Sequence, residues 1–393
     1  MIPYGWQNID QADIAAVVEV LQSDWLTQGP MIERFEQAIA QRCGAQYGVA
    51  VCNATAGLHL ACLAAGLGEG DWLWTSPISF VASANCGRYC GAGVDFVDID
   101  AHTWTIDAEA LAVKLEQAAR DGRLPKVVVA VAFAGQSADM RSIAALARQY
   151  GFTLIEDAAH AVGAHYAGAP VGCGEFADMT VFSFHPVKII TTAEGGMVLT
   201  NRADLEQRLR LLRSHGITRD AGQMTDESHG AWYYQQLELG FNYRITDLQA
   251  ALGLSQLTRL DAFLERRREL AARYQRLLAH LPVSVQAPQK DAESAWHLFV
   301  VRLQRDRIPR SHREVFDGMR AAGVGVNLHY IPIHLQPYYR DLGFNQGDFP
   351  QAESYYAEAL SLPMYPDLTD AQQDHVVESL RRLLELSVGG ADD

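Results

Sequence analysis

Short apolar segments alternate with segments of helical periodicity between about residues 47 and 200. The apolar segments are rich in β-branched or aromatic residues and have strand length: 47–52, 72–76, 94–99, 126–133 and 152–157. Helical segments lie between them at 55–67, 79–92 and 139–151. This alternation predicts an α/β fold with a mostly parallel sheet covered by helices on both faces. In such sheets, binding sites collect at the carboxyl ends of the strands.

A different pattern begins at Thr246. Thr246 and Gln249 form a T-x-x-Q capping box, and the leucine spacing predicts one long helix that ends before Pro282. Beyond it we predict a strand over 296–303, a helix over 311–323, and helices over 349–386 broken at Pro363 and Pro366. With 393 residues the chain is long enough for two or three domains. We predict a large domain over 1–259 and a smaller α/β domain over 260–393.

Charge excludes several classes of function. Lys and Arg number 32 and Asp and Glu 47, a formal net charge of −15 that disfavours nucleic-acid and anionic-membrane partners. No apolar run is long enough to span a bilayer, no secretory signal is recognised, and no G-x-G-x-x-G or phosphate-loop motif is present. We therefore expect a cytoplasmic protein.

The cysteines and histidines do not predict a metal site. None of the six cysteines forms a C-x-x-C pair, so we expect reduced core thiols rather than zinc ligands or disulfides. His329 and His334 have no acidic or cysteine partner at ligand spacing.

One lysine stands apart from the other three. Lys114, Lys126 and Lys290 lie in polar surroundings and are expected to be solvated, whereas Lys188 lies between apolar residues, shortly before Gly195-Gly196. The two glycines allow backbone to approach a ligand closely. A lysine in such a setting either extends its amine to water or has a lowered pKa that suits a Schiff-base amine.

Three further segments carry suitable partners for that amine. Asp157 ends an apolar strand, where it either caps a helix or pairs with a protonated pyridine nitrogen. Asn53, Thr55 and Gly57 open a helix, which either is merely capped or binds a phosphate at its free amides. Phe80 either packs in the core or stacks on a bound ring.

Over nearly its whole length the sequence resembles the DegT/StrS group of sugar-nucleotide aminotransferases. The resemblance rests on CNATAGLHLACLAAGLGEGD, TSPISFVASAN, IEDAAHAVGA, FSFHPVKIITTAEGGM, LGFNYRITDLQAALGLSQL and NLHYIPIH. It implies a fold-type-I transferase of the aspartate aminotransferase superfamily, with pyridoxal 5'-phosphate (PLP) as cofactor and its amino form, PMP, during turnover. It also implies a homodimer with shared active sites.

The resemblance assigns roles to individual residues. It implies that Lys188 forms the Schiff base and that Asp157 holds the pyridinium. The remaining cofactor-binding residues that it implies are Phe80 and His160 beside the ring, Thr55, the Ala56 amide and Ser183 at the phosphate, and Asn242 at the partner subunit's phosphate.

Within the group, HPVKIITTAEGG, TSPISFVASANC and SDWLTQGP are most similar to the aminotransferases of pseudaminic acid biosynthesis. This implies transfer of an amino group from L-glutamate, which leaves as 2-oxoglutarate, to C4 of UDP-2-acetamido-2,6-dideoxy-β-L-arabino-hexos-4-ulose. The product is UDP-4-amino-4,6-dideoxy-N-acetyl-β-L-altrosamine. The implied substrate-binding residues are Tyr4, Trp25, Leu26, Thr27, Gln28, Asn327, Leu328, His329 and Tyr330.

Three alternatives stay open. In the first, the chain is an aminotransferase with the same chemistry whose substrate is another 4-keto-6-deoxyhexose, linked to dTDP or GDP. In the second, it is a PMP-dependent sugar dehydratase. In the third, it is a non-catalytic paralogue. Related dehydratases carry histidine where this chain has Lys188, which argues against the second.

Overall fold

A seven-stranded sheet forms the centre of the protein, whose structure is a computed structural model describing residues 1–385. Its strand order is β1-β9-β8-β5-β4-β2-β3. The strands are β1 (Tyr47–Val51), β2 (Trp72–Thr75), β3 (Gly93–Phe96), β4 (Val127–Val131), β5 (Thr153–Asp157), β8 (Met179–Ser183) and β9 (Gly196–Thr200). Strands β3, β2, β4, β5 and β8 pair in parallel, which confirms the predicted α/β sheet. Strand β9 pairs antiparallel with both β8 and β1.

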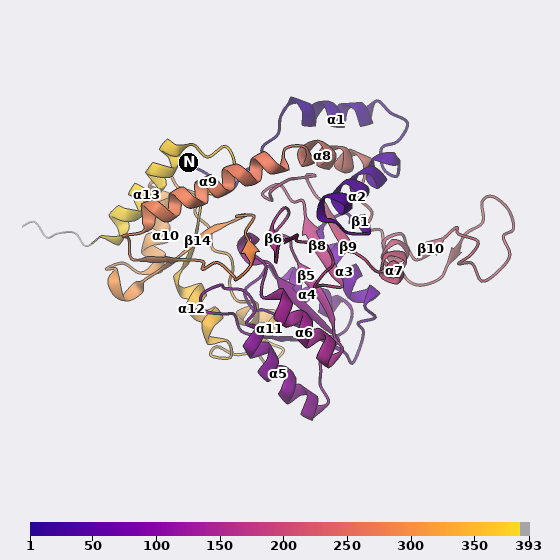
Figure 1. Ribbon diagram of the computed structural model, residues 1–393, viewed down its shortest axis with the longest axis horizontal. Helices are drawn as coiled ribbons and strands as arrows, with labels where there is room; N and C mark the ends of the chain where they lie inside the picture. The colour runs from indigo at the N-terminus through magenta and orange to yellow at the C-terminus, as the bar shows by residue number, and fades with distance from the viewer. Residues whose placement is uncertain (386–393) are drawn as a thin grey trace, which may run out of the picture.

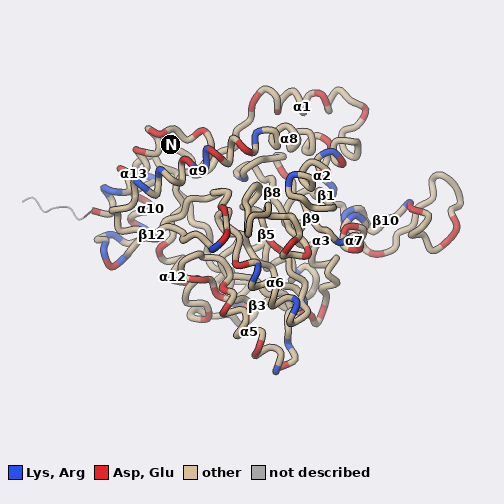
Figure 2. The backbone as a smooth tube through the Cα atoms, in the orientation of Figure 1, with Lys and Arg blue, Asp and Glu red and all other residues tan. Residues whose placement is uncertain are grey.

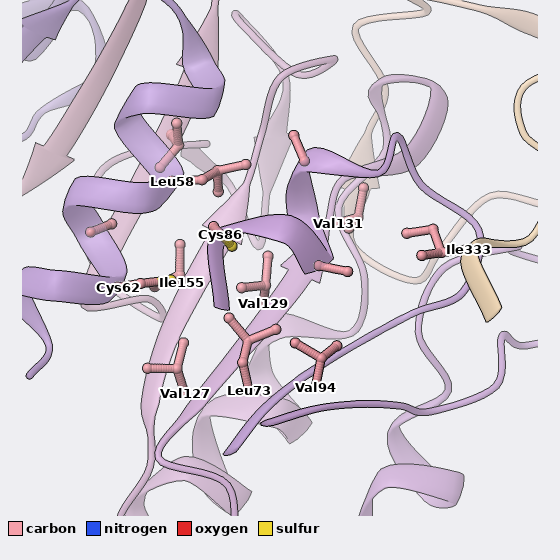
Figure 3. Close-up of a cluster of buried hydrophobic side chains, with 14 of the residues drawn as sticks. Leu58, Cys62, Leu73, Cys86, Val94, Val127, Val129, Val131, Ile155 and Ile333 are labelled. Atoms are coloured by element: carbon pink, nitrogen blue, oxygen red, sulfur yellow. The ribbon is translucent and has the colours of Figure 1, made fainter. Parts of the chain in front are cut away.

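Helices cover both faces of this sheet (Figure 1). The covering helices are α2 (Pro30–Cys43), α3 (Ala54–Ala64), α4 (Ala82–Tyr89), α5 (Ala108–Asp121), α6 (Met140–Tyr150) and α7 (Ala203–Arg213). Figure 3 shows Leu58 and Cys62 of α3 and Cys86 of α4 packed with valines of the central strands. All six cysteines are free thiols, but only Cys43, Cys62 and Cys86 are buried core residues as predicted, whereas Cys52, Cys90 and Cys173 are partly exposed. Lys and Arg, like Asp and Glu, lie mainly on the outer helices and loops around this core (Figure 2).

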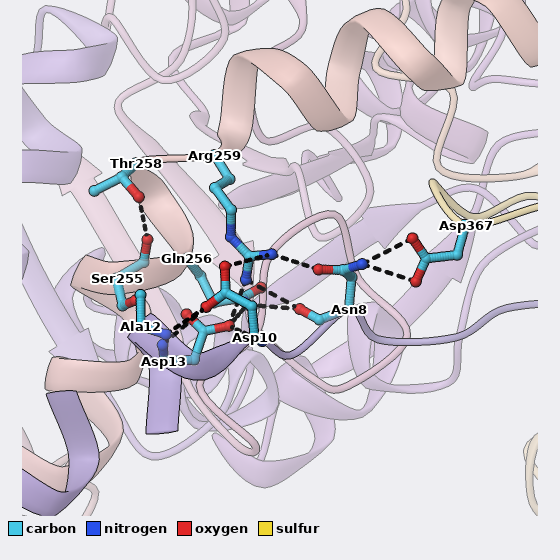
Figure 4. A network of polar contacts seen from close by, with 9 residues as sticks. All are labelled: Asn8, Asp10, Ala12, Asp13, Ser255, Gln256, Thr258, Arg259 and Asp367. Atoms are coloured by element: carbon cyan, nitrogen blue, oxygen red, sulfur yellow. Dashed lines mark hydrogen bonds and ion pairs between the residues drawn. The ribbon is translucent and has the colours of Figure 1, made fainter. Parts of the chain in front are cut away.

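The predicted long helix is wrong in one respect, because it is two helices. Helix α8 (Asp247–Leu257) begins with the predicted capping box, and α9 (Leu260–Leu278) follows after a break. At the break the Thr258 hydroxyl donates to the Ser255 carbonyl oxygen over 2.6 Å, and the Arg259 guanidinium binds Asp13 of helix α1 (Gln11–Leu21) and Asn8 (Figure 4). These side-chain contacts lie at the point where the helix is interrupted between α8 and α9. The break lets α1 lie alongside α8 while α9 runs on toward the carboxy-terminal part (Figure 1).

Beyond residue 280 a second, three-stranded sheet forms in the order β12-β14-β15. Its strands are β12 (Val283–Val285), β14 (Phe299–Leu303) and β15 (Ala359–Leu362), and the adjoining helices are α10 (His312–Ala321), α12 (Pro350–Glu358) and α13 (Asp370–Leu384). The sequence predicted residues 359–362 as helix, but this segment is strand β15. All four of its residues are buried, and pairing with β14 supplies their backbone partners.

The described segments contain no helix long and apolar enough to cross a membrane. Residues 386–393, the end of the predicted carboxy-terminal domain and helix, lie outside the described residues.

Candidate active site

A pocket of about 580 Å³ lies at the carboxyl ends of β5 and β8, beside the amino end of α3. This is the edge of the sheet where the alternating pattern predicts a site. The residues that the sequence analysis singled out and that line this pocket are Tyr4, Asn53, Thr55, Phe80, Asp157, His160, Ser183, Lys188, Asn327, Leu328, His329 and Tyr330. The fold therefore gathers segments separated by more than 300 positions along the chain.

Lys188 lies in the loop between β8 and β9, with its amine at the pocket. Burial lowers the pKa of Lys188 to about 8, and the nearby Asp157 carboxylate opposes this shift. Among the described residues, no ion pair within 4 Å involves Lys188. Its amine is therefore available in the neutral, nucleophilic form near pH 8.

The expectation that Lys114 is solvated is wrong. Its ammonium lies 2.7 Å from the Asp95 carboxylate, donates to the Phe96 carbonyl oxygen and is half-buried over the Trp74 ring. Lys114 is therefore committed to a structural ion pair. Of the four lysines, it is Lys188 that lines the pocket of about 580 Å³.

Asp157, at the end of β5, is buried and held by two donors. The Ser83 hydroxyl donates to one carboxylate oxygen over 2.6 Å, and the Ala159 amide donates to the other over 3.1 Å. Burial raises the pKa of Asp157, while these hydrogen bonds and the Lys188 charge oppose the rise. A positively charged ring nitrogen placed beside it would favour the ionised form. Ser83 lies on α4 and had no sequence signal of its own.

The first turn of α3 forms the base of the pocket. Asn53 caps the helix by accepting from the Ala56 amide over 2.8 Å, so this amide already has a partner. Thr55 and Ser183 line the pocket there, together with Ala54. A Cβ on Gly196 would lie 2.8 Å from the Ala54 amide nitrogen. Gly196 therefore lets β9 approach the chain's own backbone at this turn, rather than a ligand as the sequence suggested.

Aromatic side chains and imidazoles also line the pocket. Phe80 is 57% exposed, and its ring centroid lies 6.2 Å from that of Tyr330. His160 is buried and its Nε2 lies 3.2 Å from the Tyr330 hydroxyl. His297, which also lines the pocket, was missed because a lone histidine at the start of a strand carries no distinctive pattern.

Six predicted site residues do not line the pocket within this chain, and one of them is Ala56, whose amide donates to Asn53. Asn242 pairs with Ser214 through an isolated β-bridge, and the Gln28 amide donates to the Ile245 carbonyl oxygen over 3.1 Å. The remaining three are Trp25, Leu26 and Thr27, which precede α2 and are exposed. The roles predicted for Asn242 and for residues 25–28 therefore require contacts outside this pocket.

The pocket fits a cofactor that carries an aldehyde, a ring nitrogen and a phosphate. It offers an amine of lowered pKa, a buried carboxylate and a helix start flanked by hydroxyl groups. Within the described range no cluster of three or more His, Cys, Asp or Glu side chains is arranged to hold a metal ion.

Comparisons with known proteins identify the family of the chain. The model of the DegT/DnrJ/EryC1/StrS aminotransferase family matches residues 7–381. The spore coat polysaccharide biosynthesis protein SpsC of Bacillus subtilis is 39% identical over 100% of this chain and 98% of its own. PseC of Helicobacter pylori, an aminotransferase involved in the biosynthesis of pseudoaminic acid, is 30% identical, with a TM-score of 0.88 over 98% of this chain and 99% of its own.

A similar protein has been solved with the expected cofactor. The PMP form of the putative sugar aminotransferase Spr1654 of Streptococcus pneumoniae has a TM-score of 0.88 and 29% identity over 98% of this chain and 99% of its own, and a PLP form is also similar. These likenesses confirm the predicted fold-type-I architecture. The chain therefore belongs to the DegT/DnrJ/EryC1/StrS aminotransferase family, and its cofactor is pyridoxal phosphate.

Proposed function

We propose that this enzyme is a sugar-nucleotide aminotransferase that moves the amino group of L-glutamate to C4 of a 4-keto sugar, releasing 2-oxoglutarate. The observation that carries the proposal is the meeting of the Lys188 amine and the buried Asp157 carboxylate in one pocket. The presence of lysine at position 188, where related dehydratases have histidine, disfavours the dehydratase alternative. The buried Asp157 carboxylate, held by hydrogen bonds from Ser83 and Ala159, disfavours a non-catalytic paralogue.

Pyridoxal phosphate, when bound, supplies an electron sink for the carbanion that forms next to the transferred nitrogen. Thr55 and Ser183 would hold its phosphate, and Asp157 would face its ring nitrogen. The Nζ of Lys188 takes the proton from the α-carbon of glutamate and, in the second half of the reaction, delivers a proton to C4 of the sugar. Proton transfer by a positioned side chain of this kind is worth ~10²- to 10⁴-fold in rate.

We propose UDP-2-acetamido-2,6-dideoxy-β-L-arabino-hexos-4-ulose as the acceptor and UDP-4-amino-4,6-dideoxy-N-acetyl-β-L-altrosamine as the product. The likeness to PseC over nearly the whole of both chains supports this choice. Tyr4 and the segment Asn327, Leu328, His329 and Tyr330 would contact the sugar, because they line the pocket. The six free thiols are in keeping with a reaction in the cytoplasm.

A panel of nucleotide-linked 4-keto sugars tests the substrate. With glutamate as donor, we expect the UDP-linked 2-acetamido sugar to give a kcat/KM at least ~10-fold above those of dTDP- and GDP-linked 4-keto-6-deoxyhexoses, because only it presents the 2-acetamido group. Release of 2-oxoglutarate measures the rate. Preference for a dTDP- or GDP-linked sugar would reassign the substrate, and no transfer to any of them would remove the sugar-nucleotide proposal.

We further propose a homodimer in which each active site is completed by the other subunit. Asn242 belongs to the segment that joins β1 through the Val51 and Arg244 bridge, yet its side chain does not line its own chain's pocket. A role at the partner's cofactor phosphate accounts for its placement. The segment Trp25, Leu26, Thr27 and Gln28 would meet the sugar nucleotide in the same shared site.

Subunit complementation tests the shared site. Lys188→Ala and Asn242→Ala chains, each weakly active alone, are expected to recover activity when mixed, because one of the two sites in the mixed dimer is then intact. Mixing Lys188→Ala with Asp157→Asn is the matched control and should recover nothing, since both residues act within one chain's own site. Equal recovery in both mixtures, or full activity of a monomer, would contradict the proposal.

A further inference from the structure

We propose that Arg267 is a positioning residue of the active site, whose fixed charge acts through His297 to keep the adjacent His297 and His160 rings neutral. The proposal rests on the proposed function only in taking His160 as a neighbour of the bound cofactor. Arg267 itself lies behind the pocket wall and does not line it.

Arg267 is a buried cation with an unusual set of partners. It lies on α9, is 1% exposed, and its Nη1 donates to the carbonyl oxygens of Trp296, His297 and Met364 over 3.2, 3.2 and 3.1 Å. No carboxylate within 4 Å pairs with it among the described residues. A buried charge normally has a counter-ion. Because Arg267 has none within this distance among residues 1–385, its positive charge acts on the neighbouring groups without being neutralised.

His297 connects this charge with the pocket. Its ring centroid lies 4.4 Å from that of His160, and it is 4% exposed. Burial lowers the pKa of His297 well below its usual value, and the charges of His160, Lys188 and Arg267 lower it further. Its Nδ1 has no hydrogen-bond partner in the described part of the chain.

His160 has to be neutral for its hydrogen bonds to form. The Ala134 amide donates to Nδ1 of His160 over 3.3 Å, so this nitrogen must carry a lone pair. The ring proton is then on Nε2, where it donates to the Tyr330 hydroxyl oxygen over 3.2 Å. The proton of the Tyr330 hydroxyl is thereby left for another acceptor in the pocket. If His160 were protonated, its Nδ1–H and the Ala134 N–H would be two donors facing each other, and this hydrogen bond would be lost.

The groups around the two rings explain why a fixed cation matters. Cationic Lys188 opposes protonation of both rings, and the Asp157 carboxylate at the end of β5 opposes the lowering of the Lys188 pKa. The amine of Lys188 changes its charge near pH 8, whereas burial lowers the pKa of Arg267 only to about 10, so Arg267 is still charged there. The remaining groups that face the rings are His329 and Tyr330, of which burial lowers the pKa of His329 to about 3.

The experiment compares Arg267→Gln, Arg267→Lys and Arg268→Gln. Arg268 is the next residue on α9 and is exposed, so its variant removes the same charge without touching His297. In Arg267→Gln the ring pair binds a proton more readily, so the acid limb of the kcat/KM profile should move to higher pH by about one unit. Arg267→Lys keeps the charge and should keep the limb in place while lowering kcat/KM. A limb that stays in place in Arg267→Gln, or moves as far in Arg268→Gln, overturns the proposal.

Nitrogen NMR of ¹⁵N-histidine-labelled, cofactor-free protein gives a readout that requires no substrate. His160 in the unsubstituted protein should be the neutral Nε2–H tautomer at about pH 6, just below the ordinary pKa of histidine. When the pH is lowered, a ring of the pair in Arg267→Gln should become protonated at a pH about one unit higher than in the unsubstituted protein. A protonated or Nδ1–H His160 in the unsubstituted protein overturns the proposal even if no variant folds. This NMR result does not depend on the substrate, so it would stand even if none of the nucleotide-linked sugars accepted an amino group.

Discussion

Replacing Lys188 by alanine is expected to lower turnover by ~10⁴-fold or more, because the amine that we propose as both Schiff-base former and proton carrier is lost. The fold should persist, since the Lys188 side chain makes no hydrogen bond or ion pair within the described residues. Stopped assays of 2-oxoglutarate release measure the loss, and the visible absorbance of the Schiff base should disappear with it.

Lys126→Ala is the matched control. Lys126 forms a partly exposed ion pair with Asp71 over 2.9 Å, away from the pocket, so its loss should leave turnover within about 2-fold. A Lys188→Ala variant that kept both the absorbance and the activity would show that another amine carries the reaction.

Replacing Asp157 by asparagine is expected to slow turnover by ~10²- to 10³-fold with a smaller loss of bound cofactor. An amide accepts the Ser83 hydrogen bond but cannot balance a positive charge on the ring nitrogen. The groups at the start of α3 that we propose to hold the phosphate are unaffected. Single-turnover kinetics and a cofactor-binding titration separate the two effects.

Ser83→Ala provides the comparison for Asp157→Asn. It removes one donor and leaves the carboxylate charge, so the rate should fall much less than in Asp157→Asn. Equal losses in the two variants would mean that Asp157 serves to hold α4 against β5 rather than to bind a charge.

The sequence by itself determined the local elements and two chemical groups of the site. Strands β1 to β5 and helices α3, α4 and α6 follow from apolar segments whose period is set by the backbone, which is a local property. The capping box at Thr246 predicted the start of α8 for the same reason. Lys188 and Asp157 stood out because a charge flanked by apolar residues is costly unless it has a use.

Tertiary structure decided the features that depend on distant partners. Strand β15 exists because β14 pairs with it, and the break before α9 exists because Arg259 meets Asp13 of α1, far away in the sequence. Ser83, His297 and Arg267 acquire their relation to the site only when α4, β14 and α9 pack around it. Hydrogen bonds and burial of this kind depend on the distance in space between groups, which the spacing along a sequence does not contain.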